Sequence, residues 1–303
     1  MAVQLVVVVN PTAGRGRRAE LADVAIERLR AAGHAVERLQ AVDAPTLERL
    51  LRRRLDVNPP GAVVVAGGDG TVHLVANVLA RSGIPLGILP IGSGNDAARS
   101  IGIPHDDPDA CCARLIAALA TDDLATKPVD AVRTSTGRWF VGVLSAGFDA
   151  AVNERANTLR WPRGQARYVL AVLLELARLT PHRYRITIDR DARQVDAVLV
   201  AVANTSTFGG GMRIAPGAST ADGLLDVVVA TPLPRFRLLQ LLPRVFAGTH
   251  LTDDHVAVVH GRVVTVDVAD RTGPTPVAYA DGERLGPLPV TCEVVAAALA
   301  VLA

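Results

Sequence analysis

Two patterns of hydrophobic and polar positions succeed each other along the chain of 303 residues. Over the first part, short apolar runs such as residues 5–9 alternate with stretches rich in Ala, Arg and Leu, such as residues 18–32 and 46–55. Short apolar runs without polar alternation are typical of strands that are buried on both faces, and the stretches between them have the length of helices. The pattern therefore predicts a parallel α/β domain over residues 1–128.

The pattern changes after residue 128, where β-rich segments are separated by turn residues. Residues 129–303 are therefore predicted to form a β-sandwich or an open barrel. One helix is expected near residues 166–179 and a second near residues 236–246. The apolar tail at 290–302 is expected to pack back onto one of the two domains. The β-rich segments are residues 129–133, 139–144, 184–189, 195–203, 225–229, 256–259 and 263–268.

The most informative motif is Gly67-Gly68-Asp69-Gly70-Thr71, which directly follows the apolar run 62–66. Glycines let the backbone adopt positive φ and approach a ligand closely, and a helix that begins near Thr71 would direct its first N–H groups at an anion. Asp69 cannot attract an anion by itself, so we expect it to reach phosphate through a divalent cation. The motif favours a nucleoside triphosphate with Mg²⁺, although a generic tight turn would also contain such glycines.

Two similar loops strengthen the phosphate interpretation. The apolar run 84–90 leads into Ile91-Gly92-Ser93-Gly94-Asn95-Asp96 and then into an Ala-rich helical stretch, and the run 5–9 leads into the loop at residues 10–16, which contains Gly14 and Gly16. Three units of strand, glycine loop and helix would place all three loops at the carboxyl edge of one parallel sheet. That edge is where α/β proteins bind their ligands.

Composition and charge exclude several other functions. The net charge of +2 and the 3% aromatic content disfavour nucleic acid as a partner. Lys127 is the only lysine among 32 basic residues and lies in no glycine loop, which excludes a Walker A loop or a protein-kinase site. Because no apolar run approaches the ~18 residues that span a bilayer, we expect a soluble, cytoplasmic protein without a transmembrane segment.

Two loops of the second region are candidates for chemistry. The first covers residues 204–226 and contains Gly209-Gly210-Gly211 and Asp222-Gly223, which fit either a close backbone approach or a long hairpin connection. The second is Tyr279-Ala280-Asp281-Gly282-Glu283-Arg284. Taken alone, its Asp-Gly pair favours an ordinary type I′ hairpin turn.

Taken in order, these motifs resemble those of the bacterial soluble diacylglycerol kinases. This lipid-kinase family also includes sphingosine and ceramide kinases and is distantly similar to NAD kinases and 6-phosphofructokinases. The resemblance covers essentially the whole chain, whereas Gly67 to Thr71 alone would also fit an NAD kinase. The motifs that carry it are Asn10-Pro11 with Gly14 and Gly16, Gly67 to Thr71, Gly92 to Asp96, Ala146-Gly147-Phe148-Asp149, Gly209 to Gly211 with Pro216, Asp222 to Asp226, and Asp281-Gly282-Glu283.

The resemblance implies a Rossmann-like, NAD-kinase-like nucleotide-binding domain followed by a β-sandwich domain. It assigns ATP to Asn10, Gly67, Gly68, Gly70, Thr71, Ser93 and Asn95, with Asp69 and Asp96 in the catalytic Mg²⁺ network. By the same resemblance, Asp222 and the backbone carbonyls of Ser219 and Leu224 form a second, structural Mg²⁺ site. Glu283 with Asp281 is implied to activate the acceptor hydroxyl as a general base.

Three positions depart from the family pattern. His73 and Leu74 stand where relatives often carry Asn-Glu, and Ala41 occupies a place where relatives often have a nucleotide-contacting Thr. These changes bear on the nucleotide contacts and on the headgroup that is accepted.

The sequence therefore predicts an ATP- and Mg²⁺-dependent lipid kinase that phosphorylates a primary hydroxyl. Diacylglycerol is the leading candidate for the substrate. A kinase of another lipid alcohol (a sphingoid base, ceramide or a polyprenol), an NAD-kinase-type enzyme and an inert nucleotide-binding regulator are the alternatives. The lipid is expected at the inner face of a membrane, to which residues 159–174 could dock peripherally; a core helix with a solvated basic cap is the competing interpretation of that stretch. The sequence leaves open whether the protein is a homodimer.

Overall fold

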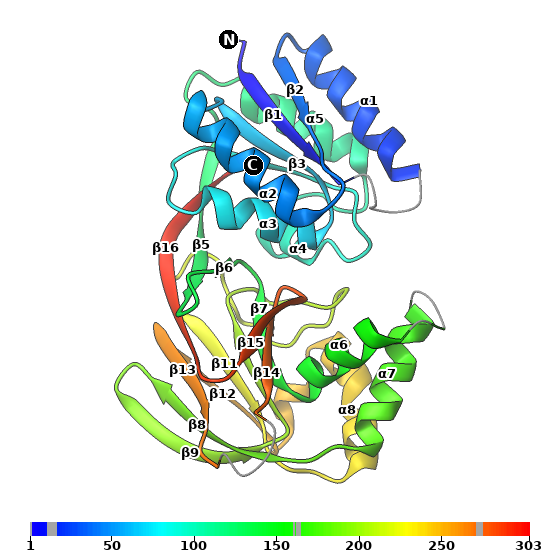
Figure 1. Ribbon diagram of the computed structural model, residues 1–303, viewed down its shortest axis with the longest axis vertical. Helices are drawn as coiled ribbons and strands as arrows, with labels where there is room; N and C mark the ends of the chain where they lie inside the picture. Colours follow the sequence, from blue (N-terminus) through cyan, green and yellow to red (C-terminus); the bar gives the residue numbers. More distant parts are fainter. Residues whose placement is uncertain (1, 11–16, 160, 162–164, 271–274) are drawn as a thin grey trace. The chain divides into compact units, whose positions relative to one another are not determined.

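The computed structural model describes residues 2–10, 17–159, 161, 165–270 and 275–303, and it divides into two compact units (Figure 1). Unit 1 comprises residues 1–131, 220–222 and 295–303, and unit 2 comprises residues 132–219 and 223–294. The last strand, β16 (Val290–Leu302), begins in unit 2 and ends in unit 1. Within the described part of the chain, no helix is long and apolar enough to cross a membrane.

Unit 1 alternates strands with helices, in the order that the apolar runs predict. Local sequence fixes the helix ends: the Asp43 carboxylate, for example, accepts a hydrogen bond of 2.7 Å from the Thr46 N–H at the start of α2. The elements are β1 (Gln4–Val9), α1 (Arg17–Ala31), β2 (Ala35–Leu39), α2 (Ala44–Val57), β3 (Ala62–Gly67), α3 (Asp69–Leu79), β4 (Leu86–Pro90), α4 (Asp96–Ile101), α5 (Pro108–Leu119) and the first part of β5 (Thr126–Thr134).

The sheet of unit 1 is parallel and has the strand order β2-β1-β3-β4. The end of β16 adds a parallel neighbour to β4, where Val301 pairs with Leu86. Every residue of β3 and β4 is buried, as expected for strands that are covered on both faces.

Unit 2 contains mainly antiparallel strands, with three α-helices in its described part. Its elements are β6 (Trp139–Phe140), β7 (Val143–Gly147), α6 (Phe148–Thr158), α7 (Gln165–Ala177), β8 (His182–Ile188), β9 (Asp191–Ala197), β10 (Leu199–Ala203), β11 (Leu225–Ala230), α8 (Arg235–Ala247), the 3₁₀ turn η1 (His250–Thr252), β12 (Val256–Gly261), β13 (Val263–Val268), β14 (Val277–Ala280), β15 (Glu283–Pro287) and the first part of β16.

Two sheets of unit 2 share one core. The first has the strand order β12-β11-β10-β7-β14-β15, and the second contains β9, β8, β13 and the beginning of β16. Leu144, Val202 and Val227 from the first sheet pack in the same cluster as Tyr184 and Val266 from the second. Unit 2 is therefore a β-sandwich, and the predicted fold class, a parallel α/β domain with a β-sandwich domain, is confirmed.

The opposite face of the first sheet is covered by helix α8, the turn η1 and the loop between β10 and β11. Ala201 and Val228 of the sheet pack there with Ile214 of the loop and Val245 of α8. Helices α6 and α7 pack on each other through Val152 and Ala171, among others.

Two features of unit 2 differ from the sequence-based expectation. Helix α6 follows β7 directly, although only the helices near residues 166–179 and 236–246 were expected. The expected single strand at 195–203 is two strands, because the chain passes from one sheet to the other at Val198.

Candidate functional site

The carboxyl ends of β1, β3 and β4 lie side by side in unit 1. Val9, the last residue of β1, pairs with Ala66, and Gly67, the last residue of β3, pairs with Pro90 at the end of β4. The expectation that the glycine loops start at one sheet edge is thus confirmed for the described residues. Asn10, half-buried, begins the first loop; residues 11–16, including Gly14 and Gly16, lie outside the described residues.

The second and third loops touch through their backbones. A Cβ atom on Gly68 would lie 2.9 Å from the Gly92 Cα, and a Cβ on Gly92 would overlap the Gly68 Cα. The Ile91 N–H also donates to the Gly67 carbonyl at 3.1 Å. Glycine is required at both positions because any side chain would push the loops apart.

Asp69 links these two loops. It is the first residue of α3, and its half-buried carboxylate accepts a hydrogen bond of 3.1 Å from the Ala97 N–H near the start of α4. Behind it, the Thr71 and Val72 N–H groups both donate to the Gly68 carbonyl, and Gly70 is exposed. The N-terminus of α3, an 11-residue helix, therefore lies at the sheet edge beside a fixed carboxylate.

Asn95 and Asp96 are both buried at the start of α4. Asn95 adopts a left-handed conformation with φ of 55°, and its Nδ2 donates to the Pro90 carbonyl at 3.1 Å. Its Oδ1 is buried and accepts no hydrogen bond from any described residue. A Cβ on Gly92 would lie 2.6 Å from that oxygen, so the glycine leaves space beside it. A buried acceptor next to such a space fits a proton donor or a cation from a ligand.

Two basic residues near this sheet edge have different hydrogen-bond partners. Arg99 donates from Nη1 to Asp96 Oδ1 at 3.2 Å and from Nε to His105 Nε2 at 3.1 Å, so it lies in the loop region with a carboxylate as its partner. Lys127 instead donates from Nζ to the Ile101 carbonyl at the end of α4, and burial lowers its pKa. Among the described residues, the cation that contacts a carboxylate at this edge is thus Arg99, and its part in binding phosphate stays a prediction. Ser93 is exposed in the same loop.

Asp281 and Gly282 form the two-residue turn between β14 and β15 in unit 2, with φ of 51° and 81°. This is the backbone conformation of the hairpin turn that the Asp-Gly pair favours. The Asp281 carboxylate accepts three backbone hydrogen bonds, from Val141 at 3.1 Å, Gly142 at 2.9 Å and Val143 at 3.2 Å. Asp281 thus fastens the hairpin to the segment that enters β7.

Two residues that complete this arrangement, Gly142 and Asn204, had no role predicted from the sequence. A Cβ on Gly142 would lie 2.5 Å from Asp281 Oδ1, so only glycine allows the contact. Asn204 donates from Nδ2 to the Val141 carbonyl at 2.7 Å and from its backbone to the Gly142 carbonyl. The separation of about 140 residues in sequence between Asp281 and its partners left no local signal for them.

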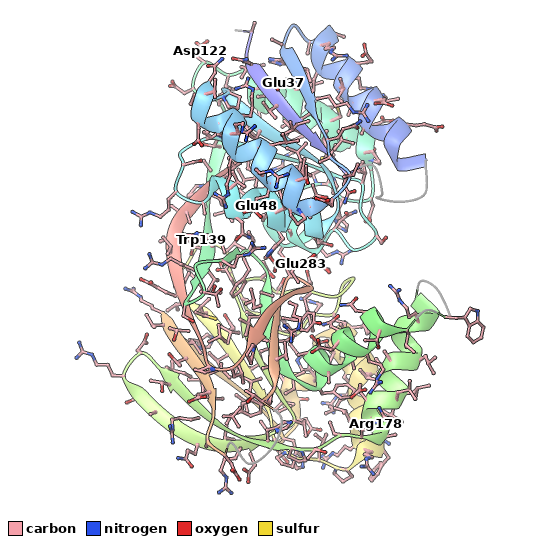
Figure 2. All side chains as sticks on the ribbon, viewed as in Figure 1. Glu37, Glu48, Asp122, Trp139, Arg178 and Glu283 are labelled. Carbon is pink, nitrogen blue, oxygen red and sulfur yellow. The ribbon has the colours of Figure 1, made fainter. Side chains whose placement is uncertain are left out.

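Glu283 is the first residue of β15 and pairs with Ala280 across the turn. Its side chain is exposed, and Figure 2 shows it at the tip of the β14–β15 hairpin. The following residue, Arg284, turns to the opposite face of the strand and forms an ion pair of 3.0 Å with Glu154 of α6. The hairpin therefore holds Asp281 and Glu283 two residues apart, with only the former fixed by backbone donors.

The candidate structural metal site is a short turn before β11. Ser219 and Asp222 are exposed, Leu224 is half-buried, and Gly223 has a positive φ of 69°. In the described residues, no three His, Cys, Asp or Glu side chains gather closely enough to hold a metal ion. The ligand set implied here is of another kind, with one carboxylate and two backbone carbonyls, which suits the oxygen-binding Mg²⁺ ion.

An apolar cavity of about 90 Å³ lies within unit 2, between the first sheet and helices α6, α7 and α8. Val172, Val228 and Leu241 are among the many apolar side chains that line it. Its main polar groups are the buried side chains of Asp149 and His250. Burial lowers the pKa of His250, whose Nε2 lies 3.0 Å from the Ile214 carbonyl.

Asp149 is held in place by two neighbours. Its Oδ2 accepts hydrogen bonds from Ser145 Oγ at 2.7 Å and from Asn153 Nδ2 at 3.3 Å. In the sequence, Asp149 belongs to a family motif, but no function was predicted for it. The available sequence signal was an acidic residue directly after an apolar strand and the pair Gly147-Phe148, with Ser145 four residues before it.

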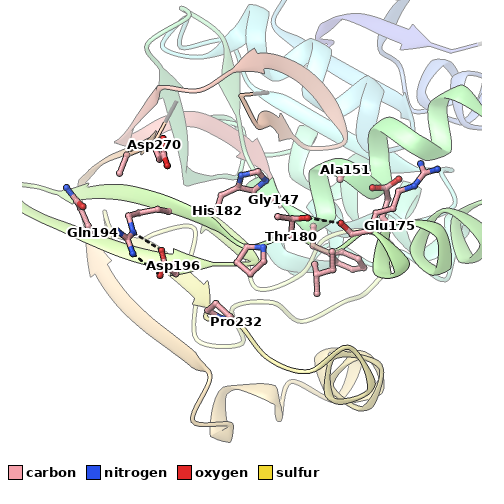
Figure 3. A pocket seen from close by; sticks show the side chains of 15 residues that line it. Gly147, Ala151, Glu175, Thr180, His182, Gln194, Asp196, Pro232 and Asp270 are labelled. Atoms are coloured by element: carbon pink, nitrogen blue, oxygen red, sulfur yellow. Dashed lines mark hydrogen bonds and ion pairs between the residues drawn. The ribbon is translucent and has the colours of Figure 1, made fainter. Parts of the chain in front are cut away.

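A larger polar pocket of about 1170 Å³ lies elsewhere in unit 2, between the end of α7 and the hairpin of β8 and β9 (Figure 3). Arg183 and Asp196 face each other there, with Nε and Nη2 at 2.9 and 3.3 Å from the two carboxylate oxygens. This contact lowers the pKa of Asp196, and burial lowers the pKa of His182. Because the cation and the anion already satisfy each other, we assign no ligand to this pocket.

Comparison with known proteins places both parts of the chain. Residues 4–127 match the diacylglycerol kinase catalytic domain, and residues 142–303 match the YegS C-terminal NAD kinase beta sandwich-like domain. A diacylglycerol kinase of Mycobacterium tuberculosis is 39% identical over 298 residues, which cover 97% of this chain and 93% of that protein. A probable lipid kinase YegS-like of Klebsiella pneumoniae is 30% identical over 241 residues, covering 78% and 76% of the two chains.

The crystal structure of a diacylglycerol kinase from Bacillus anthracis superposes with a TM-score of 0.70, covering 99% of this chain and 96% of that chain. At 20% identity this likeness concerns the fold alone. The two domain matches and the identity over nearly the full length show more: the chain belongs to the diacylglycerol kinase and YegS-like family of lipid kinases, whose kinase chemistry implies the use of ATP.

Proposed function

We propose that the protein is an ATP- and Mg²⁺-dependent diacylglycerol kinase, which transfers the γ-phosphoryl group to a primary hydroxyl and yields phosphatidic acid. The observation that carries the lipid assignment is the apolar cavity with the buried Asp149 carboxylate in unit 2. A molecule with a small polar head and an apolar tail matches such a lining. At about 90 Å³ the cavity is smaller than typical ligand pockets of roughly 300 Å³ or more, so the surrounding helices must shift to admit a whole chain.

Residues 1–128 would bind the nucleotide and residues 129–303 the lipid. We assign the phosphates to Asn10, the loop Gly67 to Thr71, Ser93 and Asn95, with Asp69 and Asp96 as the carboxylates for Mg²⁺. The close approach of Gly68 to Gly92 and the buried Asn95 Oδ1 support this assignment. When bound, Mg²⁺ neutralises phosphate charge. The chain itself contributes the N–H groups at the start of α3 and the guanidinium of Arg99.

Glu283 is proposed as the general base that takes the proton of the acceptor hydroxyl as its oxygen bonds to the γ-phosphorus and the bond from that phosphorus to the leaving ADP oxygen breaks. Its exposed carboxylate, at a fixed hairpin tip, is available for this task. Asp281 is proposed as a positioning residue, because its carboxylate already serves three backbone N–H donors. Asp222, with the carbonyls of Ser219 and Leu224, is proposed to hold a second Mg²⁺ with a structural role.

A sphingoid base is a second candidate substrate, and Asp149 is the observation that favours it. A buried carboxylate at the cavity would pair with the ammonium group of an amino alcohol, whereas with diacylglycerol it would accept hydrogen bonds from a hydroxyl. In either case the substrate lies in a membrane, so we propose that the enzyme works in the cytoplasm as a peripheral protein at the inner membrane face.

A phosphorylation assay separates these possibilities. Radiolabelled ATP and Mg²⁺ are supplied with mixed micelles that contain diacylglycerol, sphingosine, ceramide or undecaprenol in turn, and with NAD in solution as the fifth arm. We expect product on diacylglycerol and its loss in Glu283→Gln. Asp149→Asn, which keeps the size of the side chain, should alter lipid KM more than KM for ATP. Product only with NAD, or with no acceptor, would refute the proposed function.

A further inference from the structure

Helix α8 (Arg235–Ala247) exposes an apolar stripe on its outer face. Phe236, Leu239, Pro243 and Phe246 are all exposed, and the spacing of three, four and three residues places them on one side of the helix. Phe236, Leu239 and Phe246 retain 65%, 43% and 53% of their surface. Only Arg235, Gln240 and Ala247 are also exposed on this helix. We call the four apolar residues the α8 stripe.

Such exposure is unusual for the phenylalanines of this chain. The chain has five Phe, and the other three, Phe140, Phe148 and Phe208, are buried or half-buried. Single exposed apolar residues are common on protein surfaces and need no explanation. Two phenylalanines, a leucine and a proline on one side of a helix are different, because apolar residues that gather on a surface mark interaction sites.

The inner face of α8 is apolar as well. Leu238, Leu241, Leu242 and Val245 line the cavity beneath the helix. The helix thus separates an apolar cavity from an apolar outer surface. Leu238 also packs with the α6–α7 cluster, and α7 exposes Leu173 and Leu174 (51% and 36%), which extends the apolar character to a neighbouring helix.

The charges of α8 favour an anionic partner. The helix contains three arginines and no acidic residue. Arg237 and Arg244 form ion pairs with Asp253 at 3.5 and 3.3 Å, and Arg235 is exposed at the N-terminal end of the α8 stripe. Apolar side chains on one face with arginines at its border are typical of helices that lie in the interface of an anionic membrane.

We propose that the α8 stripe inserts into the surface of an anionic lipid bilayer, with Arg235 at the level of the headgroups. The proposal rests on the proposed function in one respect, since the cavity behind α8 would then take its lipid from the layer in which the helix lies. A bilayer accounts for both faces of the helix. A second copy of the chain would cover the outer face but would give no reason for the apolar cavity on the inner one.

Vesicle sedimentation without ATP or diacylglycerol tests the surface directly. The triple variant Phe236→Ser, Leu239→Ser, Phe246→Ser is compared with the wild type on phosphatidylglycerol–phosphatidylcholine vesicles. We expect binding to weaken by on the order of tenfold or more, because the buried apolar area supplies the affinity. The control variant Val42→Ser, Val57→Ser removes two side chains that are 88% and 80% exposed in unit 1 and should bind like the wild type.

A fluorescence measurement tests the proposal without disturbing the stripe as a whole. Leu239→Cys carries an environment-sensitive fluorophore, which should shift to the blue on anionic vesicles, whereas the same label on Val42→Cys should not. Selective labelling is feasible because Cys111, Cys112 and Cys292 are all buried, and burial raises the pKa of the Cys111 and Cys292 thiols to about 11 and about 12. No shift at Leu239→Cys would overturn the proposal.

Activity on a water-soluble, short-chain diacylglycerol separates this proposal from the proposed function. The triple variant should retain wild-type turnover there and lose it on vesicles. A protein that binds vesicles through the α8 stripe but phosphorylates no lipid would refute the proposed function and leave the surface intact. Equal vesicle binding by wild type and triple variant would overturn the proposal. So would a wild type that is a dimer in ultracentrifugation, if the triple variant is a monomer with unchanged vesicle binding.

Discussion

The β14–β15 hairpin allows its two carboxylates to be tested separately. Asp281 Oδ1 accepts hydrogen bonds from Gly142 and Val143, and Oδ2 accepts one from Val141. In Asp281→Asn the orientation that keeps the two bonds to Oδ1 turns the new NH₂ group towards the Val141 N–H, which leaves two donors facing each other. The turn itself is preserved, because Asn tolerates the left-handed conformation at φ of 51°.

The expected loss of stability follows from these contacts. A hydrogen bond to a charged acceptor contributes about 1.5–3 kcal/mol, and a buried N–H without a partner costs about 1–3 kcal/mol. We expect Asp281→Asn to lower the free energy of unfolding by about 2–4 kcal/mol, and Tm by roughly 4–16 °C for a unit of this size. Glu283→Gln changes an exposed side chain and should stay within about 0.5 kcal/mol of the wild type.

The rates should show the opposite order. Glu283→Gln removes the proposed base and should lower kcat by ~10²–10⁴ with little change in KM for ATP. Asp281→Asn, assayed where it is fully folded, should lose less. Asp191→Asn, an exposed residue at the start of β9, is the matched control for both measurements. Equal kcat for Glu283→Gln and wild type at saturating ATP would retire the base assignment, and an unchanged Tm for Asp281→Asn would refute the positioning role.

Three further predictions follow from the other sites. Asp69→Ala should lower turnover by on the order of 10²–10³ or more with the fold intact by circular dichroism, because a carboxylate for Mg²⁺ and the acceptor for the Ala97 N–H are removed. Asp222→Asn should abolish a rise of Tm with added Mg²⁺, since a ligand that binds only the folded state stabilises it; a wild-type titration curve would contradict the second metal site. Burial lowers the pKa of His250 below 6.5, so the unfolded chain takes up a proton first and stability should fall as the pH drops below about 6.5. His250→Gln should make Tm less sensitive to pH between 7.5 and 5.5.

The fold of unit 1 could be predicted because its sequence signals are local. Each buried strand is a continuous apolar run, and each of the loops after β3 and β4 begins where that run ends. Gly68 and Gly92 are glycines because the two loops touch at these residues. The glycines of the motif therefore already indicate the close approach of the loops. A parallel sheet then brings the loops to one edge without any further information.

In unit 2, several features could not be predicted from local sequence signals. The run 195–203 is uniformly apolar towards its end, and nothing in it reveals that the chain changes sheet at Val198. Helix α6 was missed because its N-cap is Gly147, which has no capping side chain, and because its buried apolar residues are sparse. Asp281 was recognised through its turn, but its three donors come from Val141 to Val143, a contact that only the folded sandwich creates.

Helix α8 could be predicted from the sequence, but the exposure of its apolar side chains could not. Nine of its thirteen residues are apolar, which would favour burial on more than one side, and the sequence predicts the helix correctly near residues 236–246. The structure buries only the side with Leu241 and leaves Phe236 and Phe246 in contact with water. Whether an apolar residue has a partner is a property of the whole fold and its surroundings. For an enzyme whose proposed substrate is itself a component of a bilayer, we propose that bilayer as the partner of α8, and Phe236, Leu239 and Phe246 would then form the surface by which the enzyme reaches its substrate.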